Sequence, residues 1–144
     1  MNKAIVISLI LLGTLCSHAA TVEIKMLNNG KDGIMTFEPG FVSAQPGDTV
    51  VFVPTDPAHS VASFLVPDGA KTFTGKMNEK VTVKLEKEGV YIVKCEPHLP
   101  MAMVAVIQVG KAGNLAAAKE KADGLSKGFA MNKDRLAKYM GQIK

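Results

Sequence analysis

The chain has few residues that can form disulfides or bind soft metals. Its 144 residues include only two cysteines and three histidines. One of each, Cys16 and His18, falls in an N-terminal segment that we expect to be removed. The single remaining cysteine excludes an internal disulfide framework. An unpaired thiol in an oxidising compartment needs either deep burial or a metal.

Concentrated positive charge is also missing. The 17 lysines and arginines are scattered, with no arginine run and no interleaved aromatic residues. This pattern argues against a nucleic-acid partner. The formal net charge is +4 and falls by one when Lys3 is removed with the N-terminal segment. Such a mild positive field fits transient docking to an acidic protein surface.

A long apolar run occurs only at the N-terminus. Lys3 precedes the apolar run Ala4–Leu15, and small residues follow, as at a signal peptidase site after Ala19 or Ala20. The run is short for a bilayer span, which takes about 20 residues. We therefore predict that residues 1–20 are a removed signal peptide and that the mature protein is periplasmic, without membrane insertion.

The following segment, residues 21–110, has a β pattern. Apolar and polar residues alternate over 22–26 and again over 81–85, and glycine and proline turns separate the short runs. No helical period intervenes. The roughly 124 residues that remain after cleavage suffice for one domain. The spacing predicts an antiparallel sandwich or barrel.

Beyond residue 110 the pattern becomes helical. Asn114 is placed to cap a short helix from Leu115 toward Ala122, which we expect to end at Gly124. Asn132 is placed to cap a second helix. We expect residues 111–144 to pack on the same domain as a helical extension. The apolar residues of the second helix follow the i, i+3, i+4, i+7 stripe: Leu136, Tyr139, Met140 and Ile143.

Soft and borderline donor atoms gather in one nine-residue loop, which contains Cys95, His98 and Met103. The loop joins two apolar strands, so its two ends are fixed. A further histidine, His59, follows the apolar strand that ends near residue 53. A thiolate, two imidazoles and one thioether form the ligand set of a blue copper electron-transfer centre. Prolines 97 and 100 stiffen the loop, which favours such a centre.

Each candidate ligand taken alone has a simpler explanation. A buried thiol, a surface histidine or a core methionine is common, but none explains why all three types converge. A structural zinc site usually takes four cysteine or histidine ligands, and the mature chain offers three. A Cys–His nucleophile lacks an orienting partner, so we predict no enzyme. A copper-delivery protein without redox cycling and a metal-free secreted module stay open.

These residues lie in a sequence that resembles the pseudoazurin branch of the cupredoxins. The most specific stretch runs from Gly89 to His98 and closes with Met103. Further similarity lies in Gly33–Pro39 and Pro46–Val50, and it extends over essentially the whole mature chain, including the two C-terminal helices.

The resemblance implies a mainly β fold, an eight-stranded Greek-key cupredoxin β-sandwich with two C-terminal α-helices. It implies one copper ion bound by His59, Cys95, His98 and Met103. It further implies a periplasmic, monomeric electron carrier. The implied redox partners are copper nitrite reductase, nitrous oxide reductase or c-type cytochromes in denitrification.

The chain departs from the family pattern near His59. Ser60 stands where the family usually has asparagine, although the Ser60 N–H can still reach the Cys95 sulfur. Pro57-Ala58 replaces the usual Lys-Gly, which thins the ring of lysines around the copper end. The lysines left as candidates for docking are Lys31, Lys76 and Lys94.

His98 is expected to be the more exposed histidine and the exit for the electron. An apolar docking patch is expected around it, formed by Met35, Pro39, Leu99, Pro100, Met101 and Ala102.

Overall fold

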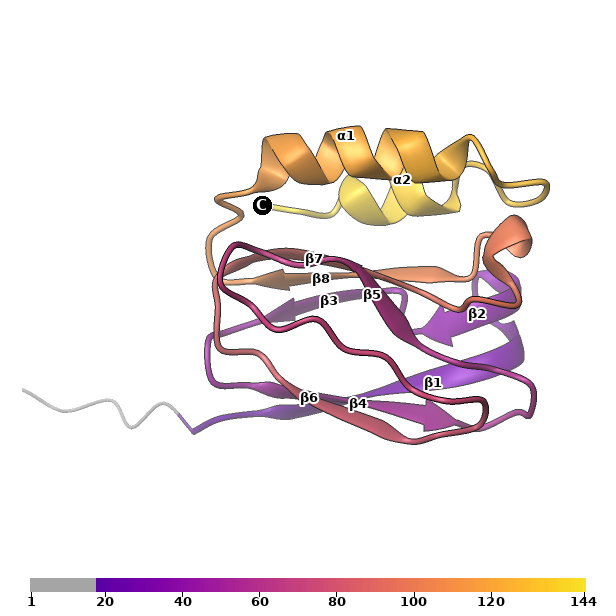
Figure 1. The fold of residues 1–144 in the computed structure, drawn as a ribbon, viewed down its shortest axis with the longest axis horizontal. Coiled ribbons are helices and arrows are strands. Elements are labelled where there is room, and N and C mark those ends of the chain that lie inside the picture. The colour runs from indigo at the N-terminus through magenta and orange to yellow at the C-terminus, as the bar shows by residue number, and fades with distance from the viewer. Residues whose placement is uncertain (1–17) are drawn as a thin grey trace, which may run out of the picture.

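The structure is a computed structural model that describes residues 18–144. Most of the predicted signal peptide therefore lies outside the described residues. Two four-stranded sheets face each other, and two helices lie along the outer side of one sheet (Figure 1). Neither helix in the described part of the chain is long and apolar enough to cross a bilayer.

The eight predicted strands are confirmed, and each sheet contains one parallel pair. The first sheet has the order β2-β1-β4-β6 and comprises β2 (Gly33–Glu38), β1 (Thr21–Gly30), β4 (Thr49–Pro54) and β6 (Val81–Lys84). The second has the order β3-β8-β7-β5 and comprises β3 (Phe41–Ala44), β8 (Val104–Val109), β7 (Gly89–Lys94) and β5 (Ala62–Leu65).

The sandwich is as expected, but two of its strand pairs depart from the antiparallel pairing that the sequence predicted. Strand β1 pairs with β4 in parallel, and β3 pairs with β8 in parallel. The chain leaves the first sheet after β2, forms β3 in the second sheet and then returns as β4. Because this crossover, and not a hairpin, brings β4 next to β1, the two strands can run in the same direction.

Which residues of a strand are buried depends on whether one face or both faces of its sheet are covered. In β1, Ile24 and Met26 are fully buried, whereas Glu23 and Lys25 are exposed, as expected when only one face of a sheet is covered. Every residue of β8 is buried, because the facing sheet covers one side and the helices cover the other.

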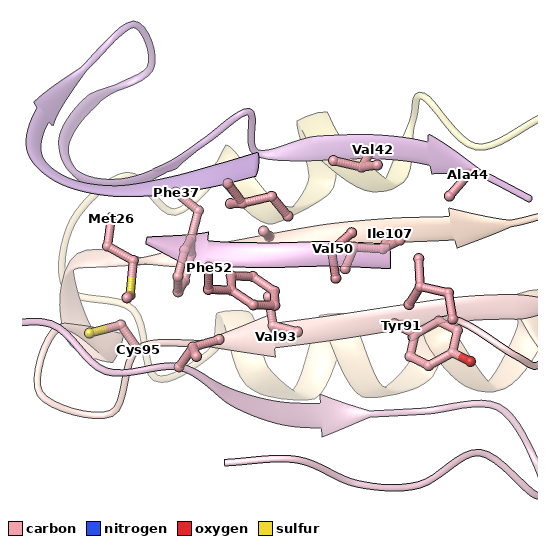
Figure 2. Close-up of a cluster of buried hydrophobic side chains, with 14 of the residues drawn as sticks. Met26, Phe37, Val42, Ala44, Val50, Phe52, Tyr91, Val93, Cys95 and Ile107 are labelled. Carbon is pink, nitrogen blue, oxygen red and sulfur yellow. The ribbon is translucent and has the colours of Figure 1, made fainter. Parts of the chain in front are cut away.

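The main core lies between the two sheets (Figure 2). Phe52 is fully buried there, in edge-to-face contact with Phe37 at 5.8 Å between ring centroids and stacked on Phe73 at 5.9 Å. Cys95 belongs to this cluster and lies at one end of it (Figure 2). A second apolar cluster joins β7 and β8 to the helices and includes Leu136 and Tyr139.

The two helices differ from the sequence prediction at their ends. Helix α1 (Leu115–Ser126) continues through Gly124, where a missing side chain costs the helix only about 1 kcal/mol. The Asn114 side chain bonds the backbone of Val90 instead of capping α1.

Helix α2 (Arg135–Met140) begins three residues after Asn132. Asn132 adopts a left-handed conformation (φ 48°), and its amide donates to the Met101 carbonyl. The prediction that Asn132 caps the helix was therefore wrong.

An acidic residue in the β1–β2 turn attaches α2 to the sandwich. The Asp32 carboxylate accepts hydrogen bonds from Lys138 Nζ at 2.5 Å and Tyr139 Oη at 2.8 Å. These two bonds hold the pKa of Asp32 below its usual value of 3.8. The ionised carboxylate therefore stabilises the folded state, and this contribution is lost as the pH falls below 3.8 through the lower native pKa.

We predict that Asp32→Asn lowers the unfolding free energy of the metal-free protein by about 1 kcal/mol at pH 7, a value discounted for solvent screening. The loss should shrink as the pH approaches 3, where protonation of Asp32 weakens the same contacts in the unsubstituted protein. Urea unfolding at both pH values measures this. The exposed Asp123→Asn is the control, and an Asp32→Asn effect equal at both pH values would contradict the assignment.

Candidate metal centre

The predicted ligand loop is closed at its ends by the strands that flank it. Cys95 directly follows β7, and Met103 directly precedes β8, its antiparallel neighbour. The Cys95 N–H donates to the Met103 carbonyl at 2.9 Å, and the Met103 N–H donates to the His98 carbonyl at 3.3 Å. The backbone thus brings the three predicted loop ligands together.

A short 3-10 helix, η1 (Leu99–Met101), shapes the middle of the loop. Pro100 lies in its first turn, where a fixed φ is favourable. Ala102 follows in a left-handed conformation with φ 58°, and its N–H donates to the Leu99 carbonyl at 2.9 Å. This turn returns the chain to β8 and buries Met103 completely.

His59 reaches the site from the loop after β4. Two hydrogen bonds fasten this loop to Asn78: the Ala58 N–H donates to Asn78 Oδ1 at 2.7 Å, and the Asn78 N–H donates to the His59 carbonyl at 2.7 Å. Asn78 was not among the site residues predicted from the sequence. The one signal for it was an asparagine in a polar turn, which is suited to the left-handed conformation it adopts.

Three of the four predicted ligands converge through their side chains. The Nδ1 atoms of His59 and His98 lie 3.1 Å apart. Cys95 Sγ lies 3.5 Å from His98 Nδ1 and 4.0 Å from His59 Nδ1. The ligand atoms of these three residues all lie within 4.8 Å of one another. Met103 lies next to them through its backbone bonds to Cys95 and His98.

Burial favours the neutral forms of these side chains. Burial raises the pKa of the Cys95 thiol, an effect that the Ser60 N–H, 3.5 Å from Sγ, partly opposes. Burial, with the nearby His98 as a further cause, lowers the pKa of His59. A neutral imidazole is the form that binds metals, and a metal ion displaces the thiol proton.

The donor set fits copper. Both Nδ1 atoms and the sulfur face one point, where a single cation can bind all three. Within residues 18–144, His59 Nε2 is the buried side-chain nitrogen or oxygen with no hydrogen-bond partner, whereas His59 Nδ1 is the nitrogen close to His98 Nδ1 and Cys95 Sγ. Imidazole nitrogens and a thiolate with a nearby thioether suit an ion that cycles between Cu(I) and Cu(II).

The two histidines of the site differ in their exposure to solvent. His59 and Cys95 are fully buried, whereas His98 is only partly buried. The expectation that His98 is the more exposed histidine is confirmed.

One expectation for the surroundings needs correction. Ala102 is fully buried and does not belong to an exposed patch, because the left-handed turn points it into the second apolar cluster. Lys94 is half-buried and pairs with Glu96 at 2.8 Å, so its charge is partly neutralised.

Comparisons with known proteins agree with this site. Residues 24–110 match the model of the copper binding proteins of the plastocyanin/azurin family. A pseudoazurin of Paracoccus pantotrophus is 50% identical over 104 residues, which cover 70% of this chain and 72% of that protein. A putative pseudoazurin of Rhizobium leguminosarum is 53% identical over 94 residues, 64% of this chain and 62% of that protein, so the match spans less than two thirds of that relative.

Solved structures give the same result. A pseudoazurin from Sinorhizobium meliloti superposes with a TM-score of 0.75 at 39% identity and covers 85% of this chain and 95% of that one. A pseudoazurin from Methylobacterium extorquens AM1 has the same TM-score and identity and covers 86% and 99%. The chain therefore belongs to the plastocyanin/azurin family of copper-binding proteins, and within that family to the pseudoazurins.

Proposed function

We propose that this protein is a blue copper electron carrier that binds one copper ion through His59, Cys95, His98 and Met103. The observation that supports this most directly is the convergence of two imidazole Nδ1 atoms and one buried sulfur within 4.8 Å. Copper supplies a one-electron couple there. The protein fixes the donors and keeps water away from them.

The ligands have different roles in this proposal. Cys95 provides the thiolate, and the Ser60 N–H donates to its sulfur, which tunes the site from outside the ligand set. His59 and His98 would supply the two imidazole donors, and Met103 would supply the weaker thioether donor. Asn78 and the Cys95–Met103 hydrogen bond hold the two ligand loops, so little needs to move when the charge of the ion changes.

Three exposed apolar residues are connected to the ligand loops through backbone bonds or through a neighbouring residue. The exposed large hydrophobic residues among residues 18–144 are Ile34, Met77 and Met131. The Met131 N–H donates to the Pro100 carbonyl, and Met77 precedes Asn78, which bonds His59. The Ile34 carbonyl accepts from Arg135, which also bonds the Met101 carbonyl.

These three side chains form a docking surface with His98 and with Leu99, Pro100 and Met101. An electron carrier must dissociate quickly, so we expect a small contact, below about 1,200 Å². The exposed Lys31 and Lys76 add a mild positive charge for orienting an acidic partner. The proposed partners are copper nitrite reductase, nitrous oxide reductase or a c-type cytochrome, in the periplasm, with this protein acting as a monomer.

The backbone contacts of Ala20 bear on the position at which the predicted signal peptide is cleaved. The Ala20 N–H donates to Asp48 Oδ1 at 2.7 Å, and the Ala20 carbonyl accepts from the Thr49 N–H at 2.8 Å. Signal cleavage after Ala19 gives Ala20 an ammonium group that pairs with the Asp48 carboxylate. Cleavage after Ala20 loses both contacts. We therefore propose that the mature chain begins at Ala20.

We predict that the purified protein with one equivalent of copper shows an intense thiolate-to-copper absorption band, which ascorbate bleaches and an oxidant restores. Cys95→Ser should abolish the band, because the charge transfer requires the thiolate. Copper binding without reversible cycling would instead indicate a copper-delivery protein. A native protein that binds no copper would contradict the ligand assignment.

We predict that Met131→Ala and Leu99→Ala slow electron transfer to a copper nitrite reductase several-fold and leave the absorption spectrum unchanged. The reason is that Leu99 follows His98 in the chain, Met131 bonds the Pro100 carbonyl of the same loop through its N–H, and neither residue is a proposed ligand. Stopped-flow reduction of the partner measures the rate. Leu115→Ala, at the start of α1, is the matched control, and equal rates for all three variants would contradict the docking surface.

We predict that the intact mass of the protein exported from a bacterial host corresponds to a chain that starts at Ala20. Asp48→Asn should lower the unfolding midpoint of this mature chain, because the charged N-terminus loses its partner. A mature mass that starts at Thr21 would show that the Ala20 contacts do not reflect the cleavage site.

A further inference from the structure

The single arginine of the chain is buried in an unusual way. Arg135, at the start of α2, is only 3% exposed, and its guanidinium donates to five backbone carbonyls. A buried cation is costly unless hydrogen bonds compensate for the lost water. The rigid fork of a guanidinium can reach several acceptors at once, which a lysine ammonium cannot do equally well.

The five carbonyls belong to two separate segments. In the β1–β2 hairpin, Arg135 bonds the carbonyls of Asp32 (2.9 Å), Ile34 (3.0 Å) and Met35 (2.7 Å). In the proposed copper-ligand loop, it bonds those of Met101 (3.4 Å) and Ala102 (3.1 Å). One side chain therefore ties the ligand loop to the hairpin.

Neighbouring residues complete this attachment. The N–H groups of Ala130 and Met131 donate to the Pro100 carbonyl at 2.8 and 3.1 Å. The Asn132 amide donates to the Met101 carbonyl at 3.2 Å. Residues 130–135 thus bond three consecutive carbonyls, those of residues 100, 101 and 102, and the next residue in the chain is Met103.

The backbone at both ends of the Arg135 network is strained. Ala102 (φ 58°) and Met35 (φ 48°) are non-glycine residues in the left-handed region, and the carbonyl of each accepts a hydrogen bond from Arg135 Nη1. Such conformations persist only where the surroundings hold them, and they concentrate at functional sites. Arg135 provides that support on both sides.

We propose that Arg135 is a positioning residue of the copper centre. It fixes the carbonyls of Met101 and Ala102 and thereby sets where Met103 lies relative to the other three ligands. This inference rests on the proposed function, because it takes Met103 as one of the residues that would bind copper. It gives the C-terminal helical extension a role in the metal site, although no residue of the extension is a ligand.

The test compares Arg135→Lys with a control on the same helix. Arg135→Lys keeps the charge but cannot bond both segments with the same geometry. Lys138→Met removes only the exposed contact between Lys138 and Asp32, which does not reach the ligand loop. Each variant is loaded with one equivalent of copper, and its absorption spectrum, electron paramagnetic resonance spectrum and copper affinity are measured.

We expect Arg135→Lys to change the relative intensities of the thiolate-to-copper bands and the rhombicity of the paramagnetic signal. Its copper affinity should fall about tenfold, the lower range for residues that orient metal ligands. Lys138→Met should retain the native spectra. Far-UV circular dichroism checks that both variants are folded.

Asn132→Ala keeps the inference testable if Arg135→Lys does not fold, because it removes one bond to the same loop at Met101. A change in the relative band intensities and in the rhombicity of the paramagnetic signal for Asn132→Ala supports the inference. Native spectra and affinity in the folded variants would overturn it and leave Arg135 a purely structural residue. A native protein that takes up no copper would instead overturn the proposed function, and this inference with it.

Discussion

The hydrogen bond between the Cys95 N–H and the Met103 carbonyl is the contact on which the site is built. It continues the β7–β8 ladder by one step beyond the last paired strand residues, Lys94 and Val104. The strands are buried between two apolar clusters, so their ends can move little. A rigid ladder therefore sets the distance between a thiol and a thioether that are eight residues apart in the chain. The loop between Cys95 and Met103 then has only to place the His98 side chain beside them.

The same sandwich explains why His59 can join the loop ligands. Strand β4 lies in the opposite sheet from β7 and β8, and its C-terminal end faces the same end of the molecule. Phe52, near the end of β4, is fully buried in the core between the sheets, where it packs against Phe37 of the same sheet and against Phe73 of the segment between β5 and β6. The proposed copper ligands thus come from both layers, and the apolar core between the layers fixes the distance from one layer to the other.

Much of this arrangement could be predicted from the sequence, since alternating burial marks the strands and scarce soft donor atoms mark the ligands. His59, Cys95 and His98 converge as predicted because short loops at the same end of a sandwich necessarily lie close together. The errors concern residues whose role depends on contacts distant in sequence. Asn132 was predicted to be a helix cap, yet its side chain bonds Met101, 31 positions away. Arg135 bonds carbonyls about 100 positions away, which no local pattern indicates.

The parallel pairing of β3 with β8 has a consequence for the order of folding. Phe41 pairs with Val106, so the second sheet lacks an inner strand until nearly the whole β region is available. His59 and Cys95 are likewise 36 positions apart. Contacts of such long sequence separation slow folding, because the chain must close large loops before it gains the packing. The ligand cluster is therefore a late product of folding, and a chain truncated before β8 has no formed site in which to hold a metal ion.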